Sequence, residues 1–258
     1  MNDMSAARQS KIPEVTLAFW VIKIAATTLG ETGGDALSMT FDLGYALSTG
    51  IFFAFFLATV TAQIRAVSYR RFLYWAVIIA TTTAGTTMAD FADRSLGIGY
   101  VGGSLILLAL LVATLAAWYL TIGSVSVDRI ATRKVEIFYW VTILFSNTLG
   151  TALGDFLADD TGLGFEGGAF VFGAVLVMIA AIYFFTRVSR TLLFWLAFIM
   201  TRPLGATVGD LLTKPHAQGG FDLSRITSSS ALALLMIGCI LFTSQQAGSH
   251  SEPDESTV

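Results

Sequence analysis

The chain has 258 residues, of which 55% are hydrophobic and 13% are charged, and 18 acidic residues outnumber 15 basic ones. A soluble domain of this length carries about a quarter charged residues, so we expect an integral membrane protein and no nucleic-acid partner. One cysteine and two histidines exclude an internal disulfide and make a haem, an iron–sulfur cluster or a classical zinc site improbable, and we expect no cofactor.

Eight apolar runs follow one another, each near the roughly 20 residues that a membrane-spanning helix requires. They cover about 13–37, 45–64, 72–92, 99–121, 136–157, 166–186, 191–211 and 227–243. We therefore expect an all-α integral membrane protein, with eight transmembrane helices in a single domain of residues 13–246. Residues 1–12 are expected to form a cytoplasmic N-terminal tail without a cleavable signal peptide, and residues 247–258 a disordered C-terminal tail.

The odd-numbered runs share one pattern, [FY]-W-x9-G-x3-[GA]-D-x8-G. Its tryptophan and aspartate are Trp20 and Asp35, Trp75 and Asp90, Trp140 and Asp155, and Trp195 and Asp210. The four units repeat at steps of 55, 65 and 55 residues. We interpret them as four parallel helical hairpins, at about 13–66, 70–122, 135–188 and 190–246, around a pseudo-fourfold or nested twofold axis.

Small residues precede each repeated aspartate by five positions and by one. They are Gly30 and Gly34, Gly85 and Ala89, Gly150 and Gly154, and Gly205 and Gly209. This spacing lets membrane helices approach closely, so we assign these residues to helix packing. The tryptophans are expected either to anchor an interfacial aromatic belt or to pack in the core.

Basic residues gather in the N-terminal segment and in the loops that follow the second, fourth and sixth helices, as at Arg70, Arg133 and Arg190. The positive-inside rule then places both termini in the cytoplasm. Each aspartate follows its tryptophan by 15 residues, or about 22 Å of helix, and so falls near the outer boundary of a bilayer core about 30 Å thick.

A carboxylate at that depth is costly unless it is paired or wet, and it also lies near the negative end of its helix dipole. Polar side chains continue inward from the aspartates at positions four, eight and, in the first repeat, twelve residues earlier. They are Glu31, Thr27 and Lys23 in the first repeat, Thr86 and Thr82 in the second, Thr151 and Asn147 in the third, and Arg202 in the fourth. The simplest assembly places the odd-numbered helices inside, with these stripes converging, and the even-numbered helices outside against lipid.

We therefore expect an ion pathway formed by the four aspartates with Glu31, Thr27, Thr82, Asn147 and Thr151. Arg202 and Lys23 are candidate counter-ions, with Arg202 placed to pair with Glu31 or Asp35 if the first and seventh helices are neighbours. The predicted function is a transporter or channel for a small cation, either a divalent metal or proton-coupled. No metal site is assigned to particular residues.

Two other classes of function are weighed on the sequence, a scaffold and an enzyme. The aspartates could be structural polar pairs in a non-transporting membrane scaffold or assembly protein. An enzyme is not expected, because no nucleophile–base pair and no Walker A pattern are present. The expected partners are the lipid bilayer and a small cation, and assembly into a homo-oligomer is compatible with the sequence.

The four repeats, together with KIPEVT-x2-FW-x2-K-x3-TT-x-GE-x3-D from Lys11 to Asp35, resemble a bacterial family of multi-pass "membrane-anchored" proteins built from a repeat of unknown function. The resemblance covers about residues 11–243 and implies a multi-pass protein of the bacterial inner membrane. It implies no activity. The fourth repeat departs from the pattern, with Arg202 and Pro203 where the other repeats have Thr-Thr or Asn-Thr.

Overall fold

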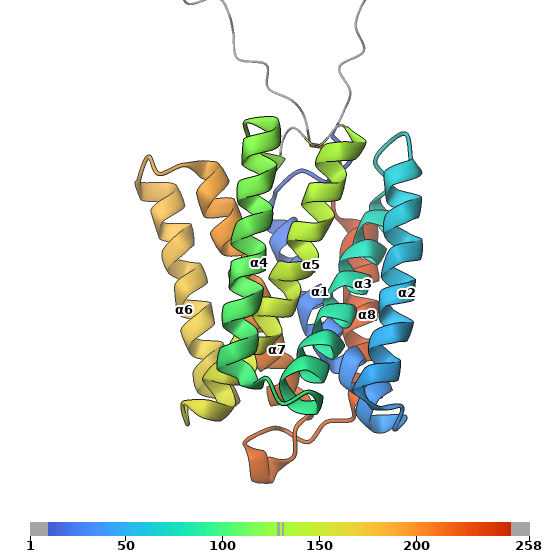
Figure 1. Cartoon of the computed structure of the whole chain (residues 1–258), viewed down its shortest axis with the longest axis vertical. Helices are drawn as coiled ribbons and strands as arrows, with labels where there is room; N and C mark the ends of the chain where they lie inside the picture. Colours follow the sequence, from blue (N-terminus) through green and yellow to red (C-terminus); the bar gives the residue numbers. More distant parts are fainter. Residues whose placement is uncertain (1–9, 128–129, 131, 249–258) are drawn as a thin grey trace, which may run out of the picture.

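The computed structural model describes residues 10–127, 130 and 132–248, so most of both expected tails lies outside the described residues. The described chain contains eight long α-helices, close to the eight expected runs (Figure 1). They are α1 (Leu17–Asp35), α2 (Gly44–Arg65), α3 (Arg71–Asp90), α4 (Gly99–Ile122), α5 (Arg133–Asp155), α6 (Gly164–Phe185), α7 (Arg190–Thr213) and α8 (Arg225–Phe242).

Among the described residues, the helices from α2 to α8 are long and apolar enough to cross a membrane. Helix α1 does not meet that criterion, and it carries three charged residues, Lys23, Glu31 and Asp35. The fold is therefore compatible with a multi-pass membrane protein.

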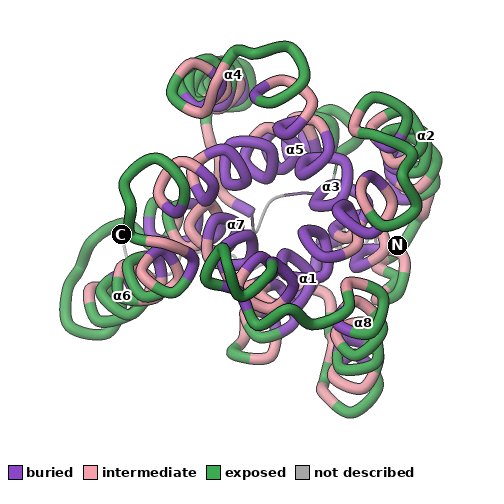
Figure 2. The backbone as a smooth tube through the Cα atoms, turned by 90° about the horizontal axis from the view of Figure 1, so that it is seen from below, coloured by how far each residue is buried: buried purple, intermediate pink, exposed green. Residues whose placement is uncertain are grey.

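Helices α1, α3, α5 and α7 form a closed inner ring. Each packs against the next, and α7 packs against α1. Viewed along the helices, these four are largely buried, whereas α2, α4, α6 and α8 surround them with exposed faces (Figure 2). This is the inside–outside division that the polar stripes on the odd-numbered helices predict.

The outer helices do not pair as the expected hairpins require. Helix α2 packs mainly against α3, α4 against α5, α6 against α7, and α8 against α1. Each outer helix therefore covers the inner helix of the following repeat rather than the inner helix of its own. The small residues of the inner helices let neighbouring inner helices contact one another directly, so the ring forms without the outer helices between its members.

The aromatic residue that precedes each tryptophan contacts the tryptophan of the following repeat. The ring centroids are 5.6 Å apart for Phe19 and Trp75, 5.7 Å for Tyr74 and Trp140, 6.2 Å for Tyr139 and Trp195, and 5.8 Å for Phe194 and Trp20. The fourth contact returns to the first repeat and closes the circle. These residues define the aromatic end of the ring, and the tryptophans pack in or against the core rather than forming an exposed belt.

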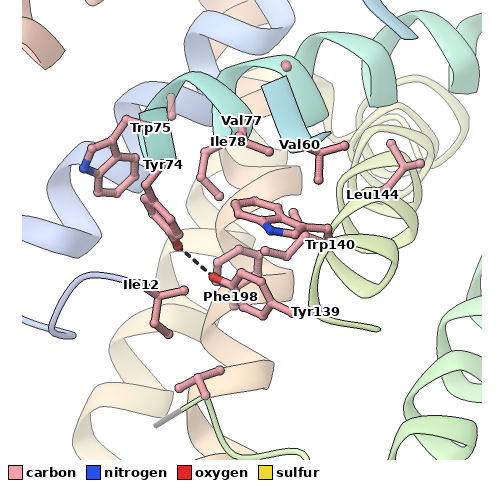
Figure 3. Packing of buried hydrophobic residues seen from close by; sticks show 14 of the residues in the cluster. Ile12, Val60, Tyr74, Trp75, Val77, Ile78, Tyr139, Trp140, Leu144 and Phe198 are labelled. Atoms are coloured by element: carbon pink, nitrogen blue, oxygen red, sulfur yellow. Dashed lines mark hydrogen bonds between the residues drawn. The ribbon is translucent and has the colours of Figure 1, made fainter. Parts of the chain in front are cut away.

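A buried hydrogen bond joins two repeats at the aromatic end. The hydroxyl oxygens of Tyr74 and Tyr139 lie 2.7 Å apart, and Ile12 packs beside them (Figure 3). Ile12 is only 5% exposed. The chain from residue 10 to 12 therefore contacts the core instead of forming part of a solvated tail.

The repeated aspartate ends its α-helix in three of the four repeats. A π-helical turn follows at Ala36–Thr40, Phe91–Ser95 and Phe156–Asp160, whereas α7 continues beyond Asp210 to Thr213. Short π-helical turns occur frequently at functional sites. The four aspartates together define the aspartate end of the ring.

Candidate functional site

The polar residues expected along the ion pathway are all buried inside the inner ring. The exposed fractions are 0% for Thr27, Thr82, Asn147, Thr151, Lys23 and Arg202, 3% for Glu31, and 1–2% for the four aspartates. We call this set the charged axis. It contains every residue that the sequence analysis proposed for the pathway and for its counter-ions.

The inner helices approach one another where a small residue faces a polar residue of the next repeat. Gly30 lies against Thr82, Gly85 against Asn147 and Thr148, Gly150 against Arg202, and Gly205 against Thr27. One turn further, Gly34 lies against Thr86, Gly154 against Ala206, and Gly209 against Glu31, while Ala89 is buried at the corresponding place. These contacts agree with the packing role assigned to the small residues.

Arg202 connects all four inner helices. Its Nη2 atom lies 2.8 Å from Oε2 of Glu31 on α1, 2.5 Å from the Thr86 hydroxyl on α3, and 2.6 Å from the Thr151 hydroxyl on α5. Of the two acids considered as its partner, Glu31 is therefore the one that pairs with it. The Nε and Nη1 atoms of Arg202 have no hydrogen-bond partner among the described residues.

Lys23 has no acidic partner within the described part of the chain. Its Nζ atom lies 3.4 Å from Oδ1 of Asn147 and 4.2 Å from the ring centroid of Phe198. The amide nitrogen of Asn147 in turn donates to the Thr81 hydroxyl at 2.9 Å. Lys23 is thus a buried basic group held by an amide and an aromatic face.

The four aspartates divide into two pairs, each bridged by a basic side chain. Nζ of Lys214 lies 3.0 Å from Asp35 and 3.1 Å from Asp210, which joins the first and fourth repeats. Arg94 lies 3.0 Å from Asp90 and 3.1 Å from Asp155, which joins the second and third repeats. These aspartates therefore have internal counter-ions.

Burial lowers the pKa of Lys214, but the carboxylates of Asp210 and Asp35 outweigh that effect and hold the pKa well above its ordinary value. Lys214 is accordingly an ammonium group at neutral pH. The guanidinium of Arg225 adds a second positive charge 3.6 Å from Asp35.

Three buried acids come close enough to share a metal ion. Carboxylate oxygens of Glu31, Asp35 and Asp210 lie within 4.8 Å of one another. Lys214 already contacts two of these carboxylates, and Arg202 contacts the third. A metal ion at this place would have to displace these side chains.

Arg94, Lys214 and Arg225 are counter-ions that the sequence pattern did not predict. The available signal was the spacing of Arg94 and Lys214, each four residues after a repeated aspartate and thus one helical turn away. Arg225 offers no such signal, because it begins α8 and meets Asp35 only through the fold. Thr86 was part of the polar stripe but was not proposed for the site.

Comparison with known proteins identifies one family. The family model described as Repeat of Unknown Function (DUF347) matches four times, at residues 18–69, 73–123, 138–189 and 193–246. The four matches confirm the repeats that the sequence pattern predicted. No curated protein and no solved structure matches the chain.

Proposed function

The chain belongs to the family defined by this Repeat of Unknown Function (DUF347), and from its charged axis we propose a membrane transport protein that moves protons or a small cation exchanged for protons. The observation that carries the proposal is the buried contact of Glu31 with Arg202 at 2.8 Å, inside the ring of α1, α3, α5 and α7. Ionisable groups inside a membrane bundle are expensive and are commonly part of an ion pathway.

The second and third repeats support a functional role for these charges. At the positions of Glu31 and Thr27, the second repeat carries Thr86 and Thr82, and the third carries Thr151 and Asn147. Helices α3 and α5 nevertheless pack in the inner ring as closely as α1 does. Uncharged residues are therefore sufficient for packing at these positions. Glu31 and Arg202 add a desolvation cost that helix packing does not require.

A proton fits the axis better than a metal ion does. Arg202 places positive charge on the axis, and in a medium of low dielectric constant it repels a passing metal ion strongly. A proton can instead be transferred between ionisable groups. Asp35 and Asp210 lie at the aspartate end, Glu31 lies close to both of them, and Lys23 lies further inside.

We place the protein in the bacterial inner membrane with both termini in the cytoplasm. The support is the distribution of basic residues, such as Arg70, Arg133 and Arg190, next to the aromatic end of the inner helices. In this orientation the aspartate end faces the periplasm. Acidic residues there would attract cations to the mouth of the pathway.

The rival function is a non-transporting membrane scaffold, and one observation favours it. Each of the four repeated aspartates already has a basic partner within 3.1 Å. A purely structural network would have this appearance. The two functions differ in whether an ion binds or moves.

Proton flux is the decisive measurement. The purified chain would be reconstituted in liposomes that contain a pH-sensitive dye, and flux would be driven by an imposed pH gradient, with the membrane potential clamped by K⁺ and valinomycin. We expect flux in the wild type, its loss in Glu31→Gln and partial recovery in Glu31→Asp. Glu166→Gln is the matched control, because Glu166 is exposed at the start of α6.

Thermal unfolding of the wild type and of Asp155→Asn, across a panel of monovalent and divalent cations, tests whether the protein is a scaffold that binds no ion. Binding to the native state adds about 2.7 kcal/mol at a hundredfold excess of ligand over Kd. Selective stabilisation of the wild type that the variant loses would identify an exchanged cation. If no cation acts and liposomes with the protein are no leakier than empty ones, the scaffold is the better description.

A further inference from the structure

The proposed proton pathway includes two buried basic side chains, Lys23 and Arg202, but only one acid, Glu31, at their level of the axis. Lys23 and Arg202 are both 0% exposed; Glu31 pairs with Arg202, whereas Lys23 has no acidic partner among the described residues. Buried charge of one sign requires a partner of the other sign, because its desolvation is otherwise uncompensated.

Arg202 has donors to spare. A guanidinium has five N–H groups, and the contacts with Glu31, Thr86 and Thr151 all involve Nη2. The Nε and Nη1 atoms, which carry the other three N–H groups, have no partner within the described residues. Leaving buried donors unpaired is costly.

Lys23 faces the same region of the axis. Its ammonium lies over the ring of Phe198, which precedes Arg202 by one helical turn on α7. Among the described residues, Nζ of Lys23 makes one hydrogen bond, the long one to Asn147 at 3.4 Å. Two basic side chains with unused N–H groups therefore face the same part of the axis.

We propose that a small monovalent anion binds between Lys23 and Arg202. Such an anion accepts hydrogen bonds from Nζ of Lys23 and from Nε and Nη1 of Arg202, and with Glu31 it balances the two positive charges. The ligand must be small, because α5 and α7 meet at Gly150 and Arg202, and α7 and α1 meet at Gly205 and Thr27. A halide or a short carboxylate such as formate or acetate has the required charge and size.

Anion binding also suggests what moves with the proton. An anion that enters together with one proton leaves the net charge of the axis unchanged, so the pair crosses the membrane without electrical work. This co-transport rests on the proposed function, whereas anion binding itself does not.

The first test is thermal unfolding of the full chain in detergent, titrated with chloride, bromide, nitrate, formate or acetate at constant ionic strength. Gluconate, which is too large for the site, is the balancing anion. We expect a saturable rise of the unfolding midpoint with at least one small anion, and the halide and carboxylate series will show which chemistry is preferred. A wild type that responds to none of these anions overturns the proposal, whatever the variants do.

The second test uses Lys23. Removing one charge of a buried pair weakens binding strongly, so Lys23→Met should raise the Kd of the preferred anion on the order of 30-fold or more. Lys23→Arg should restore most of the affinity. Lys11→Met is the matched control, because Lys11 pairs with Glu136 at 3.0 Å, away from the Lys23 site. Unchanged affinity in Lys23→Met would overturn the proposal.

Proton flux separates this inference from the proposed function. Flux that depends on Glu31, without any response to small anions, removes the anion site and leaves the transport protein. Saturable anion binding that depends on Lys23, without flux, establishes the anion site and removes the transport protein.

Discussion

Arg94 and Lys214 occupy equivalent places in the second and fourth repeats. Each follows the aspartate of its own repeat by four residues and also contacts the aspartate of an adjacent repeat. The inner ring thus has four similar helices, but the basic bridges between its four aspartates have twofold symmetry. The repeat steps of 55, 65 and 55 residues agree with a duplicated pair of repeats.

Removing the bridge at Lys214 should destabilise the protein substantially. In Lys214→Met the buried carboxylates of Asp35 and Asp210 lose their shared partner, and breaking a buried pair costs about 3–5 kcal/mol. Reversible unfolding in mixed micelles measures the difference. The exposed Arg187 gives a control, since Arg187→Met should change the free energy of unfolding by no more than about 0.5 kcal/mol.

Adding Asp210→Asn to Lys214→Met tests whether charge is the cause. The double variant removes one negative charge with the positive one, so it should be more stable than Lys214→Met alone. A double variant that is less stable by the sum of the single changes would show that Lys214 contributes packing and not charge.

Much of this arrangement could be predicted from local sequence. The helices follow from apolar runs of the right length, and the inner position of α1, α3, α5 and α7 follows from polar residues that recur at helical spacing, such as Thr82 and Thr86 before Asp90. The close approach of the helices follows from Gly85 and its counterparts. Each of these inferences depends on contacts within one helix or on a repeated position.

Other features depend on the order in which helices meet, which no single repeat encodes. The closed ring brings α2 against α3. It also pairs Asp35 with Asp210, and Asp90 with Asp155. Lys23 was considered for pairing with an acid, but it contacts Asn147 and Phe198 because those residues lie opposite it.

Alanine at Gly85 should weaken the ring. A Cβ atom there would lie 3.0 Å from the backbone nitrogen of Thr148 and 3.1 Å from the backbone carbon of Asn147, so α3 and α5 would have to separate. Overpacking of this kind costs about 1–3 kcal/mol. Gly173→Ala on α6 is the control, because a Cβ atom at Gly173 would meet nothing within 4 Å. It should be neutral or stabilise by up to about 1 kcal/mol.

Arg202 and Glu31 should behave as a coupled pair in unfolding experiments. Arg202→Met leaves Glu31 buried without its partner and should cost about 3–5 kcal/mol, whereas Glu31→Gln combined with Arg202→Met should cost clearly less. A double-mutant cycle gives the coupling energy. Independent, additive costs would mean that the 2.8 Å contact contributes little to stability.

The hydroxyl groups of Tyr74 and Tyr139, at the aromatic end, should also be coupled in their effect on stability. Tyr74 and Tyr139 are both fully buried, and their oxygens lie 2.7 Å apart. Either Tyr74→Phe or Tyr139→Phe alone leaves one buried hydroxyl unpaired and should cost about 1–3 kcal/mol. The double substitution removes both hydroxyls and should be nearly neutral, so the second change should recover stability in the background of the first. Equal, independent losses in mixed-micelle unfolding would show instead that each hydroxyl has another partner.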